Sequence, residues 1–448
     1  MQFTPWTIFI DLGLISILIF IGSVLRAKIK LVQKLFLPSA LIAGFLALAF
    51  GPNGMGYIPF SNQIGTYSGI LIALVFAALP LSTPSIPFRD VFDRVGSMWA
   101  YSQIVMILQW GLGALFGMWV LGNIWQDLNP AFGLMLASGF AGGHGTAAAI
   151  GTAFEGLGWD EAKSLAMTSA TVGILSAVIG GILLVKLGTV RGNTKFIADF
   201  KELPESLRTG FIPKEKQESI GKEITSPMSI DPLAYQFVII LMVALGGYYL
   251  SKLASYFFPT LSLPVFSCAF IMGLIVKKVF KSLGAADTLE PKVLGRFSGT
   301  FTDLLVAFGI GSIKLPVVVK YAMPLTILFI FGIAYCLFMF LYLAPRMLRQ
   351  YWYEKALFTW GWATGTMAMG IAILRIADPK LESGSLDDFA FAYIPMAPVE
   401  ILVVSLSPML FASGKGMYFI AACVGGGLAV WIASSLKGWF SFKRFENN

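Results

Sequence analysis

Charged residues are what this sequence lacks most, and their scarcity excludes an ordinary soluble protein. Asp, Glu, Lys and Arg make up 12% of the 448 residues, whereas 57% are hydrophobic and the mean hydropathy is +0.78. A soluble domain carries about 25% charged residues. Because helices satisfy their own backbone hydrogen bonds in lipid, the composition predicts an all-α polytopic membrane protein.

Cysteine and histidine are also rare. The three cysteines, Cys268, Cys336 and Cys423, all fall within apolar segments, so neither a disulfide framework nor a metal cluster is indicated. The one histidine, His144, has no second histidine or cysteine that could share a metal with it. We therefore expect no cofactor and no enzyme activity, since no nucleophile, base and metal accompany this histidine.

The excess of positive charge does not indicate nucleic acid as a partner. The net charge is +8, but the lysines fall in short loops between apolar segments, where cytoplasmic loops of membrane proteins carry them. The first apolar segment, 7–25, has its basic residues after it, so we expect it to remain as a helix rather than to act as a signal peptide.

A series of apolar segments follows, with one long polar stretch at 187–231 that we interpret as a linker between two membrane halves. Before the linker, the segments lie at about 7–25, 37–51, 65–82, 96–122, 131–153 and 164–186. After it, they lie at about 232–250, 261–276, 298–313, 322–344, 356–374, 389–411 and 417–436.

Two glycine-rich stretches interrupt this pattern. Residues 139–152 hold five glycines and His144, and residues 361–370 resemble them at a constant offset of 222. Glycine-broken segments at matching positions of two halves point to a transporter binding site. A structural alternative stays open, because small residues also let two transmembrane helices pack closely.

Two further motifs recur in the same order. Leu-Phe-Leu-Pro at 35–38 returns as Leu-Ser-Leu-Pro at 261–264, each opening an apolar helix. Gly-Thr-Tyr-Ser at 65–68 returns as Gly-Thr-Phe-Thr at 299–302, each expected at the head of a helix. The ordered set predicts an internal repeat.

The placement of Lys and Arg predicts the topology. The basic loop after the first segment should be cytoplasmic, which leaves the N-terminus outside. The basic linker then lies inside only if 131–153 re-enters, and the basic tail lies inside only if 356–374 re-enters. We expect two inverted repeats of five transmembrane helices and one re-entrant hairpin each, with an extra C-terminal helix, eleven spans in all. The corresponding domains are 1–192, the linker 193–231, 232–412, and 413–448.

The hairpins supply the expected binding site. Opposed hairpin tips lie near the bilayer midplane, where free N–H groups suit a carboxylate and freed carbonyls with threonine hydroxyls suit Na⁺. We expect the first hairpin to break at 142–145, and leave open whether His144 donates to the substrate or braces the loop. The expected substrate-binding residues are Gly142, Gly143, His144, Gly145, Thr146, Thr364, Gly365, Thr366 and Glu400.

Two acids fall deep within apolar segments. Asp303 and Glu400 are functional candidates because an ionisable group inside a membrane is costly, although a buried structural acid remains an alternative. The Na⁺ candidates are Thr146, Thr366, Glu400 and Asp303. Asp11, near the outer end of the first segment, is expected to be exposed at the interface, and Arg375 and Asp378 to serve as an anchor or a local pair.

The run Gly142-Gly143-His144-Gly145-Thr146 resembles the first re-entrant loop of the bacterial sodium/glutamate symporter family. Ile394-Pro395-Met396 is similar to the stretch that opens the family's next helix. The resemblance implies inverted five-helix halves, sodium coupling, an acidic amino acid substrate and elevator-type movement. The sequence departs from the family in Glu400, Asp303 and the extra helix, and these departures bear on the substrate rather than on the fold.

The leading functional prediction is a secondary active transporter that couples Na⁺ to glutamate or a related acidic amino acid. The alternative is a Na⁺- or H⁺-coupled transporter or exchanger of another small carboxylate that uses Glu400 and Asp303; a channel is disfavoured because two opposed hairpins interrupt the path. We expect the bacterial inner membrane, a cytoplasmic C-terminus, a small anionic substrate and the lipid bilayer as partners, and leave a homodimer open.

Overall fold

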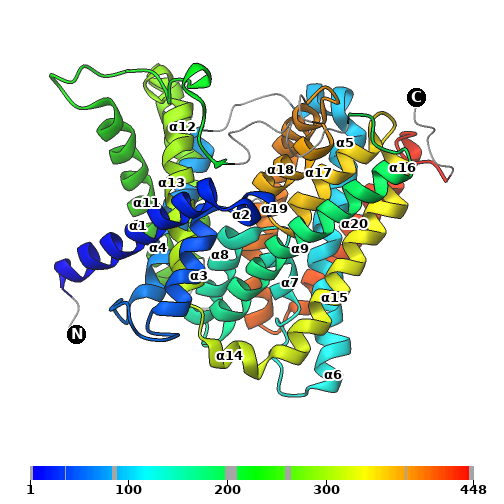
Figure 1. Ribbon diagram of the computed structural model, residues 1–448, viewed down its shortest axis with the longest axis horizontal. Coiled ribbons are helices and arrows are strands. Elements are labelled where there is room, and N and C mark those ends of the chain that lie inside the picture. The colour runs from blue at the N-terminus through cyan, green and yellow to red at the C-terminus, as the bar shows by residue number, and fades with distance from the viewer. Residues whose placement is uncertain are drawn as a thin grey trace. The chain divides into compact units, whose positions relative to one another are not determined.

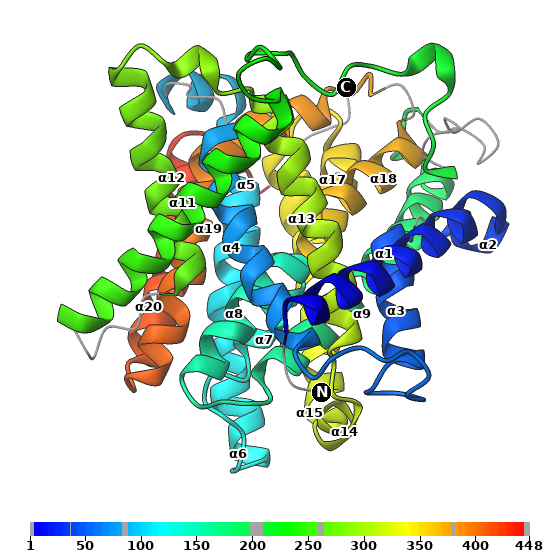
Figure 2. The ribbon, with the colours of Figure 1, turned by 90° about the vertical axis from the view of Figure 1, so that its left-hand side faces the viewer.

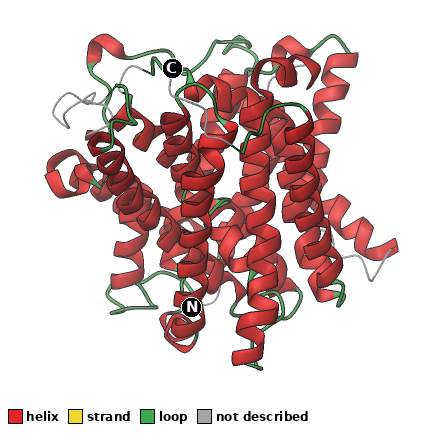
Figure 3. Ribbon diagram, turned by 90° about the vertical axis from the view of Figure 1, so that its right-hand side faces the viewer, coloured by secondary structure: helices red, strands yellow, loops and turns green. Residues whose placement is uncertain are grey.

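A computed structural model describes residues 4–35, 37–82, 88–196, 209–257, 264–378 and 381–442. Helices and connecting loops account for all of these residues, and the described part of the chain holds no strand (Figure 3). The motif residues 261–263, the middle of the linker at 197–208, and the tail residues 443–448 lie outside the described residues.

The chain forms two compact units, and each unit draws on both halves of the sequence. The first unit comprises Met1–Ser23, Pro38–Ser85 and Ile212–Ile313, and the second comprises Val24–Leu37, Ile86–Phe211 and Lys314–Asn448. The two compact units therefore do not correspond to the two halves of the sequence, because each unit contains helices from before and after the linker.

The first unit is a bundle in which α13 packs against α4 and α3, while α12 packs against α4 and α11 (Figures 1 and 2). Close contact is possible because small residues lie at the crossings; a Cβ added to Gly44 of α3 would lie 2.7 Å from Cβ of Ile310. The helices are α1 (Pro5–Lys28), α3 (Ser39–Phe50), α4 (Ile64–Ser82), α11 (Pro232–Phe257), α12 (Val265–Ser282) and α13 (Pro291–Gly311), with 3₁₀ turns η3 (Lys214–Lys216) and η4 (Ala286–Thr288).

The second unit holds both glycine-rich stretches, packed around α9. The helices α7, α8, α17 and α18 all contact α9, and α19 packs against α5, α8 and α17. The helices are α2 (Lys30–Lys34), α5 (Phe88–Leu115), η1 (Phe116–Leu121), α6 (Gly122–Ile124), α7 (Leu134–Gly139), α8 (Gly143–Gly156), α9 (Ala162–Val190), α14 (Leu315–Lys320), α15 (Ala322–Phe338), η5 (Met339–Leu343), α16 (Ala344–Met347), α17 (Trp352–Thr364), α18 (Met367–Ala377), α19 (Ser385–Ala412) and α20 (Gly416–Leu436).

The Leu-Pro motifs do open helices, as predicted. Pro38 precedes α3 with φ −61° and ψ 143°, and Pro264 precedes α12 with φ −60° and ψ 142°. Proline fixes φ and lacks an N–H that would otherwise remain unpaired at a helix start. The second copy of the other motif was misplaced, because α13 begins at Pro291 and Gly299 lies two turns inside it, whereas Gly65 is the second residue of α4.

Among the described residues, nine helices rather than eleven are long and apolar enough to cross a membrane. The two exceptions are α3 and α12, which follow the paired Leu-Pro motifs. With 12 residues, α3 is about 18 Å long, short of a hydrocarbon core of about 30 Å. In α12, Lys277, Lys278 and Lys281 shorten the apolar stretch, and Nζ of Lys277 donates to the Pro80 carbonyl of α4 at 2.9 Å.

Two π-helical segments occur at matching places in the halves. The segment η1 continues α5 and η5 continues α15. Adding the offset of 222 to the bounds of η1, 116–121, gives 338–343, one residue longer at its start than η5. A π-helical turn is rare and often lies near a functional site, so the correspondence is a further likeness between the two parts of the sequence.

Asp11 is buried rather than exposed at an interface. Its side chain is 1% exposed and accepts hydrogen bonds from Ser61 N at 2.9 Å, from the Tyr67 hydroxyl at 2.7 Å and from the Ser61 hydroxyl. The expectation was wrong because sequence position shows depth along a helix but not the polar groups that another segment brings to it. These bonds tie α1 to the start of α4.

We therefore expect Asp11→Asn to lower the stability of the full chain by about 2 kcal/mol, because an amide replaces a carboxylate that three donors face. The measurement is the melting temperature of the purified protein in detergent. Asp127→Asn, at an exposed loop position, is the control and should leave the melting temperature unchanged. Equal melting temperatures for the two variants would contradict the structural role of Asp11.

Candidate functional site

The first glycine-rich stretch forms two short helices that lie side by side. α7 ends at Gly139 and α8 begins at Gly143, so the chain turns at residues 140–142. The break was predicted at 142–145 and lies earlier, because Gly143, with φ +61°, starts the new helix. His144, Gly145 and Thr146 therefore form the first turn of α8, where backbone N–H groups have no partner within the helix.

The second glycine-rich stretch has the same design. α17 ends at Thr364, and α18 begins at Met367 after Gly365 and Thr366. The Thr366 hydroxyl caps α18 by accepting from Met369 N at 3.3 Å. The two arms touch through their glycines, since a Cβ on Gly361 would lie 2.8 Å from Gly370 N.

The tips of the two helix pairs meet in the second unit. A Cβ added to Gly143 would lie 2.8 Å from the Gly365 carbonyl oxygen and 2.9 Å from Cγ2 of Thr366. Both distances are shorter than a normal contact, so only glycine fits at position 143. The structure thus brings together residues that are 222 positions apart, at the point where α8 and α18 both begin.

The His144 side chain contacts α9 through one ring nitrogen, whereas its other ring nitrogen has no hydrogen-bond partner among the described residues. The side chain is 1% exposed, and Nε2 lies 3.2 Å from the Thr171 hydroxyl of α9. That hydroxyl donates its one hydrogen to Met167 O at 2.9 Å, so it accepts from the imidazole, and Nε2 carries the proton. Nδ1 is then an acceptor, buried and without a hydrogen-bond partner among the described residues.

The threonines of the predicted site differ in their availability. Thr364 is fully buried, and its hydroxyl donates to Trp360 O at 2.7 Å within α17. Thr146 is 7% exposed and lies against Gly142. Thr366 is partly exposed at the tip. Of the three, Thr366 is the one most open to a ligand.

The two membrane acids belong to different units. Glu400 lies on α19 in the second unit, and the Tyr393 hydroxyl, two turns earlier, donates to its Oε2 at 2.9 Å. Asp303 lies on α13 in the first unit with an exposed side chain. Within the described part of the chain, no hydrogen bond joins either acid to the helix pairs. Asp378 makes a local contact, accepting from Glu382 N and Ser383 N.

Sequence reasoning missed Gln109, a buried residue of α5 that is 1% exposed. Its Nε2 donates to Ala363 O at 3.2 Å, in the last turn of α17 before the break. Its Oε1 is buried and has no hydrogen-bond partner among the described residues. A glutamine within an apolar segment was a detectable signal, because a buried amide must find partners.

A family model described as the sodium/glutamate symporter matches residues 7–373. The chain belongs to the sodium/glutamate symporter family. It is therefore a transporter and not an enzyme, and membership supports Na⁺-coupled symport of glutamate across a membrane that the chain crosses several times. No curated protein matches the chain.

The family match covers the first helix pair of the symporter and the second as far as residue 373, within α18, and it ends before α19. Glu400, the Ile-Pro-Met stretch at 394–396 and α20 lie beyond residue 373. The family match therefore includes the residues of the two tips. Glu400 lies outside the match, so any role for it is argued from the properties of this chain alone.

Gly143→Ala should abolish transport by this symporter, because the added methyl would push the second tip away and a positive φ disfavours alanine. Uptake of labelled glutamate into proteoliposomes, with matched amounts of inserted protein, is the measurement. Gly156→Ala is the control in the same helix, since a Cβ there meets nothing within 4 Å. Normal uptake by Gly143→Ala would show that the tips need not meet.

Proposed function

We propose that the substrate of this symporter is glutamate or a related acidic amino acid, and that it binds at the meeting point of the two helix pairs. The carrying observation is the contact of Gly143 with Gly365 and Thr366, which sets the N-termini of α8 and α18 close together. Helix N-termini present free N–H groups and a positive dipole, which favour carboxylates. Gly142, Gly145 and Thr146 complete the first tip, and Thr364 supports the second from inside α17.

The ammonium group of such a substrate needs an acceptor. A site made only of N–H donors would leave that charge unpaired, at a cost of several kcal/mol. Nδ1 of His144 is the buried acceptor in the first turn of α8. We assign it to the substrate ammonium, so that His144 braces α9 through Nε2 and accepts through Nδ1.

Sodium is assigned to Glu400, with Thr146 and Thr366 as further oxygen ligands at the tips. Glu400 reaches back along α19 to Tyr393. Within that stretch, Pro398 has no N–H for the Ile394 carbonyl, so a backbone oxygen is released less than two turns before Glu400. Carboxylate and carbonyl oxygens suit a small hard cation. Asp303 is the weaker Na⁺ candidate, because it lies in the other unit.

The proposed architecture is two inverted repeats, 1–192 and 232–412, joined by the linker 193–231 and followed by 413–448. The packing of the first unit supports it. In the proposed repeat, α12 is the counterpart of α3 and α13 is the counterpart of α4, and α3 packs against α13 just as α12 packs against α4. The helix pairs are proposed to re-enter the membrane, with the N-terminus outside and the C-terminus cytoplasmic in a bacterial inner membrane. Both pairs lie in one compact unit, which suits elevator-type movement of that unit.

The decisive experiment is uptake of labelled glutamate, aspartate and unaminated dicarboxylates into proteoliposomes, with Na⁺, K⁺ or H⁺ gradients imposed separately. We expect an inward Na⁺ gradient to drive uptake of glutamate, and dicarboxylates without an ammonium group to compete poorly. Uptake that follows the H⁺ gradient alone, or exchange without net uptake, would favour a carboxylate exchanger instead.

Glu400→Gln should raise the apparent KM for Na⁺ or for the amino acid by at least about tenfold, equivalent to roughly 1.4 kcal/mol. The reason is the loss of the negative charge that is assigned to Na⁺. Asp303→Asn is the matched control and should change either KM less. Unchanged Na⁺ and substrate dependence in Glu400→Gln would make that acid structural.

A further inference from the structure

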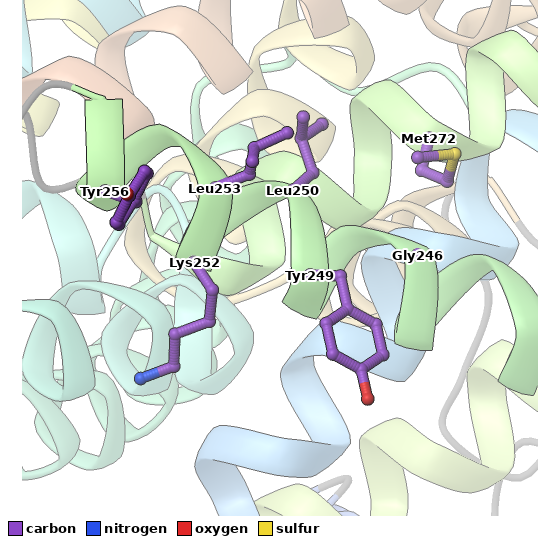
Figure 4. A pocket seen from close by; sticks show the side chains of 7 residues that line it. All are labelled: Gly246, Tyr249, Leu250, Lys252, Leu253, Tyr256 and Met272. Carbon is purple, nitrogen blue, oxygen red and sulfur yellow. The ribbon is translucent and has the colours of Figure 1, made fainter.

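The first unit carries a groove between α11 and α12 that the transport site does not use. Its volume is about 670 Å³, and it is lined by Gly246, Tyr249, Leu250, Lys252, Leu253, Tyr256 and Met272 (Figure 4). Gly246 lets the two helices approach, since a Cβ there would lie 3.0 Å from Cγ of Met272. The walls of the groove are almost wholly apolar, and its polar atoms belong to one lysine and two tyrosines.

Those polar groups share one side of α11. Tyr249, Lys252 and Tyr256 are spaced by three and four residues, which places them on one helix face, and Figure 4 shows Tyr249 and Lys252 extending in the same direction. Their side chains are exposed. Nζ of Lys252 lies 5.6 Å from the centroid of the Tyr248 ring, and within the described residues it forms no ion pair.

Lys252 lies near the end of α11, a helix long and apolar enough to cross a membrane. Lys252 precedes the last residue of the helix, Phe257, by five residues, a rise of about 8 Å. Tyrosines and lysines gather at this depth in membrane proteins, where lipid headgroups begin. The apolar groove suits the acyl chain of a phospholipid. The Lys252 ammonium, which forms no ion pair within the described residues, suits the phosphate of its headgroup.

We propose that this groove binds one acyl chain of an anionic phospholipid, whose phosphate pairs with Lys252 and accepts hydrogen bonds from Tyr249 and Tyr256. Charge complementarity selects this occupant over a second copy of the chain. A two-fold contact centred on the groove would bring two Lys252 side chains together, and the lining offers no acid to separate them.

The test uses the full chain, purified and delipidated in a mild detergent. Phosphatidylglycerol and phosphatidylcholine with identical acyl chains are added separately, and lipid retained by the protein is measured by native mass spectrometry alongside the melting temperature. We expect phosphatidylglycerol to bind more tightly and to raise the melting temperature more.

Lys252→Ala should weaken phosphatidylglycerol binding about fivefold and remove the difference between the lipids, because one lysine near a membrane surface contributes about that much. Lys252→Arg should keep the preference. Lys278 is an exposed lysine on α12 that does not line the groove. Lys278→Ala is therefore the matched control and should also keep the preference for phosphatidylglycerol.

Three outcomes would overturn the proposal. The first is equal binding of the two lipids to the parent protein, and the second is an unchanged preference in Lys252→Ala. The third is efficient disulfide-linked dimer formation in membranes by Tyr249→Cys, which would place a second copy of the chain at the groove.

Discussion

The small residues of α9 are the constraint on which the second unit depends. α9 receives both helix pairs, and Gly173 lies where a Cβ would strike the Thr364 carbonyl and the Phe140 ring. One helical turn further, the Ala177 carbonyl accepts from Trp360 Nε1 at 3.2 Å. α9 fits against both helix pairs because Gly173 has no side chain there. A larger side chain at Gly173 would push Phe140 and Thr364 away from α9.

Much of this arrangement could be predicted from the sequence. Hydropathy indicated the helices because burial in lipid demands long apolar runs. Glycine spacing indicated both breaks, although the first begins two residues before the range expected. The Leu-Pro motifs opened α3 and α12 because proline has a local conformational preference. The family resemblance at 142–146 was confirmed, since a short run of consecutive residues is enough to recognise a motif.

The remaining features depend on contacts between distant segments. The burial of Asp11 depends on Ser61 and Tyr67, and the bracing of His144 depends on Thr171; neither partner is marked in the sequence. The length of α3 was overestimated because an apolar loop and an apolar helix look alike in composition. Gly299 was placed at a helix start because the basic residues before it read as a loop, although they are helical in α13.

The π-helical segments place surplus backbone at the ends of α5 and α15. A π-turn contains one residue more than an α-turn, so α5 and α15 each hold one extra residue of backbone in their last turns. If that surplus residue migrates along the helix, the residues that it passes rotate by about 100° and shift by about 1.5 Å, while their hydrogen bonds are remade one at a time. Both helices thus hold the backbone needed for a one-residue change of register.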